Sequence, residues 1–219
     1  MIEYIDKILY EIPNHLDYAD IPEDLDLEDV PIERISALVE LLNHEDKNIQ
    51  FRAAILATNW GIIEGFTKLN IFLDDEEYLE DDGFSSHRLR NYNEIYEQIL
   101  SAFIRYQAIG NDNLVEGIKE IVFAPIAKII EKSNYQPFSI GLLYYSSEEK
   151  YTPLFKKHLS LIIIDRKNNY WKIHDVLKKL LQVDKDWVYQ FLEKHNLKLK
   201  KFGLKDERGF FERLFYSYK

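Results

Sequence analysis

The chain of 219 residues contains no cysteine and has only 8 glycines and 6 prolines. Without cysteine it forms no disulfide framework, no thiolate metal site and no cysteine nucleophile. The longest purely apolar run, residues 161–164, is far shorter than the roughly 20 residues that span a membrane. Residues 1–12 are acidic and have neither the basic region nor the cleavage site of a signal peptide. We therefore expect a cytoplasmic protein with no membrane partner.

Apolar residues make up 46% of the chain and charged residues 30%. This composition is too apolar for a disordered chain, and the length is enough to bury a hydrophobic core. The length fits one large domain or two small ones, and we expect a single domain over residues 1–219. The scarcity of glycine and proline favours a rigid scaffold over a switching one.

Charge is distributed unevenly around the net value of −10. The basic C-terminal part, residues 150–219, holds 17 Lys and Arg against 8 Asp and Glu, whereas the acidic part, residues 1–149, holds 11 against 30. The first acidic cluster comprises Asp17, Asp20, Glu23, Asp24, Asp26, Glu28 and Asp29. The second acidic cluster comprises Asp74, Asp75, Glu76, Glu77, Glu80, Asp81 and Asp82. Such clusters attract cationic partners and repel phosphate, or they are solvated surface that faces the basic part within one fold.

Apolar residues recur at helical spacing almost throughout the chain. Asp46 is suited to cap the second helix and Gly61 to end it, while Asp184 or Asp186 is suited to cap a later one. Pro125 predicts a kink or restart because it cannot donate an amide hydrogen bond. The spacing predicts helices over residues 32–43, 46–60, 62–73, 95–110, 114–130, 153–164, 170–183, 186–196 and 210–218. Residues 74–91 and 134–152 are predicted as loops, with residues 138–145 either a short strand or a buried irregular segment.

The predicted fold class is therefore all-α. Because the turns are short, neighbouring helices should form antiparallel hairpins. Helix pairs recur roughly every 40–60 residues without strong identity, which favours an irregular α-solenoid of about 8–10 helices over a closed bundle.

One stretch carries a more specific pattern. Residues 41–69, LLNHEDKNIQFRAAILATNWGIIEGFTKL, resemble a HEAT repeat. The matching features are a Leu-Leu helix end, an Asp in the turn, and then Ile49, Ala53, Ala54 and Leu56 in the second helix. Gln50, where a turn arginine is common, and the Pro125 interruption depart from the family pattern.

The HEAT resemblance implies a curved stack whose second helices line a concave face. Such folds usually bind a protein or peptide and only rarely catalyse. Small acidic HEAT-like proteins include immunity proteins encoded beside bacterial polymorphic toxins. By this analogy the chain is a non-catalytic protein-binding module, and its sharper form is an immunity-type inhibitor that blocks a basic toxin.

Motifs for catalysis, metal binding and cofactor binding are missing. The six histidines are scattered, and no pair has the spacing that places two metal ligands on one helix face. His44, Glu45 and Asp46 lie in a turn where capping explains them, and the second acidic cluster lacks the glycine of a calcium loop. No nucleophile or phosphate-binding glycine motif occurs. We expect no enzyme activity, no metal and no cofactor.

Two alternatives stay open. The concave groove could serve an enzyme or a binder of nucleic acid or a small ligand, since a basic patch lies beside Phe202. The patch comprises Lys194, Lys198, Lys200, Lys201 and Lys205. The strongly acidic residues 1–149 oppose phosphate binding. The third possibility is a generic adaptor, and the oligomeric state is undetermined.

The partner-binding residues are expected where aromatic and acidic side chains coincide. The chain has 15 Tyr, 13 Phe and 3 Trp, most of which packing explains. Some lie near helix ends or loops beside charges, as residues at protein-binding hot spots do. The predicted partner site comprises Trp60, Tyr92, Tyr96 and the second acidic cluster, which would attract a basic protein.

Overall fold

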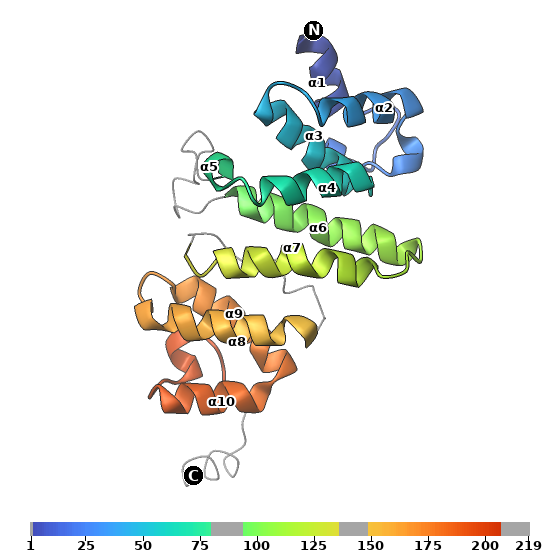
Figure 1. Ribbon diagram of the computed structural model, residues 1–219. Coiled ribbons are helices and arrows are strands. Elements are labelled where there is room, and N and C mark those ends of the chain that lie inside the picture. Colours follow the sequence, from blue (N-terminus) through green and yellow to red (C-terminus); the bar gives the residue numbers. More distant parts are fainter. Residues whose placement is uncertain (1, 80–93, 136–148, 207–219) are drawn as a thin grey trace. The chain divides into compact units, whose positions relative to one another are not determined.

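The computed structural model describes residues 2–79, 94–135 and 149–206 (Figure 1). The regular structure in these residues is helical, which confirms the all-α prediction. The α-helices are α1 (Ile2–Tyr10), α2 (Ile32–Leu41), α3 (Lys47–Asn59), α4 (Ile63–Phe72), α5 (Glu76–Leu79), α6 (Glu94–Asp112), α7 (Ile118–Lys132), α8 (Thr152–Ile162), α9 (Tyr170–Val183) and α10 (Lys185–Lys194). Short 3-10 turns include η1 (Pro22–Asp24), η2 (Leu27–Asp29) and η6 (Leu199–Phe202). Across the described ranges, no helix combines the length and apolarity needed to cross a bilayer.

The chain divides into two compact units, unit 1 (Met1–Ile129) and unit 2 (Ile130–Lys219). Helices pack mainly against their neighbours in sequence, such as α3 on α4 and α8 on α9. The division falls within α7 and not at residue 150, where the net charge changes sign.

Several local predictions are confirmed residue by residue. The carboxylate of Asp46 accepts a hydrogen bond from the Asn48 amide (2.8 Å) and caps α3. Gly61, which follows the end of α3, has a φ of +78°, a left-handed conformation that favours glycine. Helix α9 has the predicted bounds, and Asp184 rather than Asp186 caps α10 by accepting from the Trp187 amide (3.2 Å).

Other predictions need correction. Helix α6 runs through Gly110 to Asp112, and α7 begins at Ile118 instead of Leu114. Leu114 has a φ of +56° and is 89% exposed, so it lies in the turn and not on a buried helix face. Of the two alternatives at Pro125, the restart does not occur, because the residue lies inside the continuous helix α7, and the kink stays a prediction. Helix α1 is not among the predicted helices.

Three further predictions fall wholly or partly outside the described residues. The expected loop over residues 74–91 contains the short helix α5, and its residues 80–91 lie outside the described ranges. The possible strand over residues 138–145 and the final helix over residues 210–218 also lie outside them.

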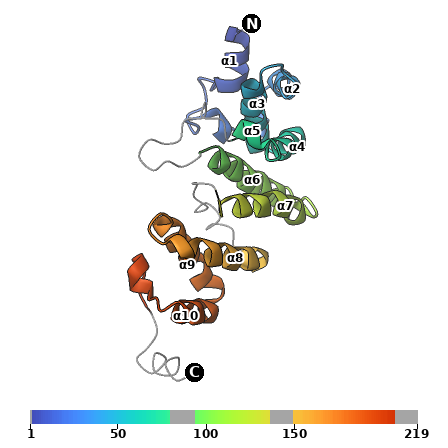
Figure 2. The same ribbon diagram turned by 60° about the vertical axis from the view of Figure 1, so that its left-hand side comes forward.

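The core of unit 1 is built around α3. This helix packs on α4 most extensively, and also on α1, α2, α6 and η1 (Figures 1 and 2). Its buried residues are Phe51, Ala53, Ala54, Ile55, Leu56, Ala57, Thr58 and Asn59. Because the helix contacts several others, small alanines are needed where the backbones approach closely.

A close approach of two helices in this core joins α3 and α4 at Gly65. A Cβ atom at residue 65 would lie 2.6 Å from the Cβ of Ala57 and 2.7 Å from the backbone nitrogen of Thr58. Real Cβ atoms essentially never approach so closely. Residue 65 must therefore lack a side chain if the two helices are to keep this separation.

In unit 2, α9 packs against both α8 and α10. The buried residues of these three helices include Phe155, Leu159, Ile173, Leu177 and Val188. Gly203 follows η6 with a φ of +71°, and the carbonyl of Phe202 accepts a hydrogen bond from His174 Nδ1 (2.7 Å). The η6 turn is therefore held against α9 by this side-chain hydrogen bond.

Substitution of Gly65 tests the close approach of α3 and α4. We expect Gly65→Ala to lower the free energy of unfolding by about 2–3 kcal/mol, because the added methyl group meets backbone atoms that can only separate if the helices move. Denaturant unfolding followed by circular dichroism measures this change.

Gly117→Ala is the matched control for this experiment. Gly117 has a φ of +73°, but a Cβ there meets nothing within 4 Å. That variant should cost only about 1 kcal/mol, from backbone conformation alone. A smaller loss for Gly65→Ala than for Gly117→Ala would contradict the proposed steric constraint.

Candidate functional site

Two aromatic residues of the predicted partner site lie in the core of unit 1. The Trp60 side chain is 1% exposed, and its indole Nε1 donates a hydrogen bond to the carbonyl of Pro22 (2.8 Å). The guanidinium of Arg34 lies 5.2 Å from the Trp60 ring centroid. Tyr96, on α6, is also fully buried. Both side chains contribute packing, and neither is on the surface of the described structure.

The described carboxylates at the start of the second acidic cluster are matched by lysines of unit 1. Asp74 pairs with Lys128 (2.5 Å) and Asp75 with Lys47 (2.6 Å). The hydrogen bond from Lys47 lowers the pKa of the Asp75 carboxyl below its usual range. The Glu76 and Glu77 backbones belong to α5, whereas Glu80, Asp81, Asp82 and Tyr92 lie outside the described residues. Their role in partner binding stays a prediction.

The first acidic cluster is placed differently, on a chain segment that folds against α3. Its apolar residues Ala19, Pro22, Leu25 and Val30 are buried. The 3-10 turns η1 and η2 form within the segment, and η1 contacts α3. The indole N–H of Trp60, in the core, donates a hydrogen bond to the carbonyl of Pro22 in this segment. This segment is thereby fixed to the core although it has no α-helix of its own.

The outer side of this segment combines carboxylates with exposed apolar side chains. Tyr18 and Ile21 are each 49% exposed, and Leu27 is 43% exposed. We call this the acidic surface, which comprises Asp17, Tyr18, Asp20, Ile21, Asp24, Asp26, Leu27 and Glu28. Single exposed apolar residues are common, whereas a group of them rimmed by polar side chains marks a candidate protein-binding surface.

Hydrogen bonds within the segment hold Tyr18 in place. Its hydroxyl donates to the Asp29 carboxylate (2.6 Å) and accepts from the Asp26 amide (3.2 Å). The hydrogen bond to Asp29 is the main cause of a raised pKa of the Tyr18 phenol. Because both partners belong to the same segment, Tyr18 presents its ring to solvent at little further cost in conformational entropy.

A cavity of about 540 Å³ adjoins the acidic surface. It is lined by Ile21, Glu23, Asp24, Arg52, Ile55, Asn59, Gln98, Ser101, Ile104, Arg105 and Ala108. Arg105 crosses it, donating to the carbonyl of Asn59 (3.0 Å) and pairing with Asp24 (3.1 Å). The side-chain oxygen of Gln98 is buried there with no hydrogen-bond partner among the described residues. Because this oxygen is buried from solvent, the cavity leaves room beside the acidic surface but does not expose the Gln98 acceptor.

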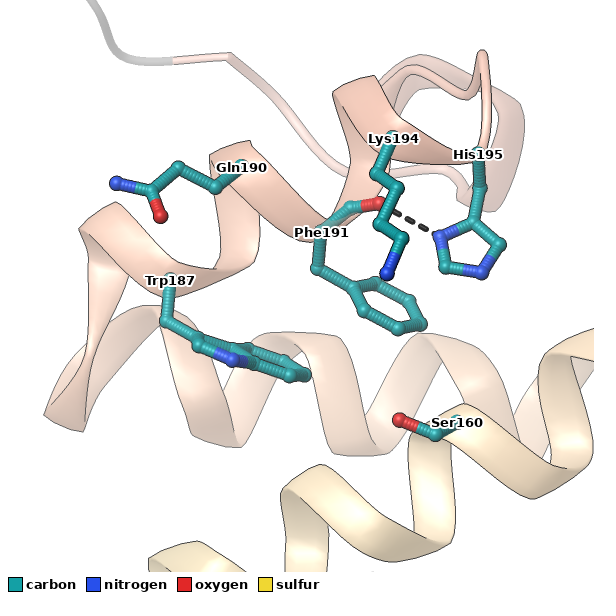
Figure 3. A pocket seen from close by; sticks show the side chains of 6 residues that line it. All are labelled: Ser160, Trp187, Gln190, Phe191, Lys194 and His195. Carbon is teal, nitrogen blue, oxygen red and sulfur yellow. Dashed lines mark hydrogen bonds between the residues drawn. The ribbon is translucent and has the colours of Figure 1, made fainter.

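Unit 2 carries a second candidate site, an aromatic groove of about 400 Å³ along α10 (Figure 3). Trp187, Phe191 and His195 follow one another at intervals of four residues, with ring centroids 4.8 Å and 4.3 Å apart. His195 Nδ1 donates to the carbonyl of Phe191 (2.7 Å), which fixes the orientation of the imidazole. Figure 3 shows Trp187 and Phe191 extending from α10 toward α8, which contributes Ser160.

Lysines flank this aromatic groove. The ammonium of Lys156 lies 5.1 Å from the Trp187 ring centroid and pairs with Asp184 (2.5 Å). Lys194 lines the groove and is exposed. Cations beside aromatic faces can bind an anionic or aromatic ligand, but the Trp187 ring already contacts both Lys156 and Phe191.

Buried polar groups gather between the end of α7, α8 and α9. Lys172 is 6% exposed and donates to the carbonyl of Ser133 (2.6 Å), and burial lowers its pKa to about 8. His158 is 1% exposed, and its Nδ1 donates to the side-chain oxygen of Asn134 (2.6 Å). Burial, with a contribution from the charge of Lys172, lowers the pKa of His158 to about 3. His158 is therefore neutral at physiological pH.

Metal binding finds no support in the described ranges, where no group of three or more His, Asp or Glu side chains is placed to hold an ion. The His44 imidazole accepts a hydrogen bond from the Asp46 amide (3.0 Å), as expected for a residue of the capping turn. The residues of these candidate sites that the sequence prediction did not name include Ile21, Leu27, Tyr18, Arg105 and Trp187. The signal for the first two was present, because apolar residues alternate with the carboxylates of the first acidic cluster.

Comparison of the chain with protein-family models, with curated proteins and with solved structures finds no match. Function must therefore be argued from the residues themselves.

Substitution of Trp60 tests how the acidic surface is held. We expect Trp60→Phe to lower the free energy of unfolding by about 2 kcal/mol, because the carbonyl of Pro22 loses its donor and the core loses volume. The amides of Asp24 and Leu25, which form the turns at this point, should exchange with deuterium on the order of tenfold faster. Trp187→Phe, in unit 2, is the control, and equal exchange in the two variants would contradict the role of Trp60.

The pH dependence of stability tests the burial of His158. Its folded pKa of about 3 lies below the usual 6.5, so the unfolded chain binds a proton first as the pH falls. The stabilisation is complete above pH 6.5 and is lost toward pH 3. The difference in unfolding free energy between wild type and His158→Gln should therefore fall by about 2 kcal/mol between about pH 7 and about pH 5.

The glutamine of the His158→Gln variant keeps a donor for Asn134 but does not titrate, so the comparison isolates the imidazole. The same comparison with His195→Gln, at an exposed position, should show a much smaller change. A pH-independent difference for His158→Gln would mean that the imidazole is accessible to protons in the folded state.

Proposed function

We propose that this chain is a non-catalytic protein-binding module whose acidic surface binds a basic partner. The observation that carries this proposal is the interleaving of exposed Tyr18, Ile21 and Leu27 with unpaired carboxylates on a segment fixed to the core. Among the described residues, Asp20, Asp26 and Glu28 have exposed side chains that form no ion pair.

Each component has a separate physical role. Exposed carboxylates raise the association rate of a basic partner and exclude acidic ones. The apolar side chains supply area that loses contact with water in the complex and slows dissociation. The cavity beside Ile21 gives room for a side chain of the partner.

The sharper form of the proposal is an immunity-type inhibitor that covers the active site of a basic toxin. The HEAT resemblance of residues 41–69 supports it, together with packing of helices mainly on their sequence neighbours. In this proposal the helices form an irregular HEAT-like superhelix. The buried Trp60 then acts by supporting the acidic surface, and not by contacting the toxin. A generic adaptor would differ only in the identity of its partner.

The aromatic groove favours a second candidate function, the binding of nucleic acid or a small anionic ligand by unit 2. Its support is the array of Trp187, Phe191 and His195 with Lys156 and Lys194 beside it. The ion pair of Lys156 with Asp184 already satisfies one of these cations. The support for this second function is therefore weaker than the support for partner binding by the acidic surface.

The proposal is tested by mixing the purified chain with the product of the neighbouring gene and measuring association by biolayer interferometry at low and high salt. We expect a complex whose association rate falls at high salt. Neutralising Asp20→Asn, Asp26→Asn and Glu28→Gln together should lower that rate on the order of tenfold. Absence of a complex at micromolar concentration contradicts the inhibitor.

Matched variants separate this surface from general charge effects. Glu33→Gln, Glu40→Gln and Glu45→Gln together remove the same charge from exposed positions elsewhere in unit 1, and should change the rate much less. Ile21→Ala should speed dissociation at least about tenfold, whereas Ile121→Ala, 45% exposed on α7, should not. Association with nucleic acid instead of protein would favour the aromatic groove.

A further inference from the structure

The outer sides of α2 and α4 leave large apolar side chains in solvent. Ile32 is 67% exposed, Ile63 50% and Ile71 60%. On α4, the residues Ile63, Thr67 and Ile71 follow at intervals of four and so lie along one side of the helix. This side faces away from the contact with α3, in which Gly65 and Leu69 are buried.

A groove of about 310 Å³ lies between the two helices. It is lined by Val39, Leu42, Asn43, Ile63, Glu64, Thr67, Lys68 and Ile71. We call these residues the isoleucine groove. It belongs entirely to unit 1 and shares no residue with the acidic surface.

The groove carries one charge of each sign on α4. Glu64 and Lys68 lie one turn apart, and neither forms an ion pair with a residue in the described part of the chain. The ammonium of Lys68 lies 6.0 Å from the Phe72 ring centroid. A surface with one acid and one base on the same side of a helix is complementary to itself when turned through 180°.

We propose that the isoleucine groove binds a second copy of this chain, with the two α4 helices packed antiparallel about a two-fold axis near Thr67. Ile63 of each copy then faces Ile71 of the other. Glu64 of each copy faces Lys68 of the other. With the axis near Thr67, Glu64 of one copy and Lys68 of the other are offset by two residues, about 3 Å along the helix, which the long Glu and Lys side chains can span.

A second copy fits this surface better than an unrelated partner of one charge sign. An acidic or basic partner would leave either Glu64 or Lys68 facing a like charge, at a cost in affinity. The chain as a whole is acidic, with a net charge of −10, so two copies associate only where opposite charges are locally matched. The patch is small, and the expected dimer is accordingly weak, with a dissociation constant in the micromolar range.

Sedimentation velocity of the full chain over a range of concentrations tests the dimer. We expect a concentration-dependent shift from monomer to dimer. Glu64→Lys and Lys68→Glu should each weaken association at least about tenfold, because each places like charges opposite one another. Ile71→Glu should also produce a monomer, since it puts a charge into the apolar contact.

The double variant Glu64→Lys/Lys68→Glu is the decisive comparison. It exchanges the two charges, so the match across the two-fold axis is restored and association should return to within about threefold of wild type. Glu120→Lys, exposed on α7, is the control for net charge. Circular dichroism of every variant establishes that the fold is retained.

The proposal is overturned by a wild-type chain that stays monomeric at millimolar concentration. It is also overturned by a dimer that Glu64→Lys leaves unchanged, or by a double variant that associates no better than the single ones. None of these outcomes depends on partner binding by the acidic surface, so the two proposals stand or fall separately.

Discussion

The close approach of α3 and α4 is the constraint on which unit 1 depends. Because Gly65 has no side chain, α4 lies directly on the backbone at Ala57 and Thr58. Helix α3 is then covered by α4 on one side and by α1, α2, α6 and η1 on others, which explains its run of small and apolar residues. A helix buried in this way has few surface positions, and its C-terminal Trp60 is drawn into the core as well.

The buried position of Trp60 in turn fixes part of the surface of unit 1. The indole N–H donates to the carbonyl of Pro22, and Leu25 and Val30 of the same segment are buried, so contacts with the core hold the acidic segment. Preorganisation of this kind lowers the entropic cost of binding a partner. The packing of α3 on α4 therefore supports the proposed binding surface through Trp60 and its hydrogen bond to Pro22.

Charged side chains have different environments in the two units. Asp74 and Asp75 are paired with Lys128 and Lys47 within unit 1, so their contribution to steering a partner is reduced. In unit 2, by contrast, two basic side chains, Lys172 and His158, are buried, where desolvation lowers the pKa of both. Because the formal charge counts histidine as neutral and every lysine as charged, of these two groups only Lys172, by losing its proton above about pH 8, takes the charge of the basic part below its formal value.

The sequence by itself determined the helical class and the features that neighbouring residues control. The Asp46 cap, the stop at Gly61 and the bounds of α9 all depend on contacts within a few residues, which local spacing reveals. Only the tertiary structure decided which aromatic and acidic residues reach the surface. The burial of Trp60 depends on Pro22, 38 residues away, and the pairing of Asp74 on Lys128, 54 residues away. Spacing carries no information about such distant partners, because they meet only when the helices pack.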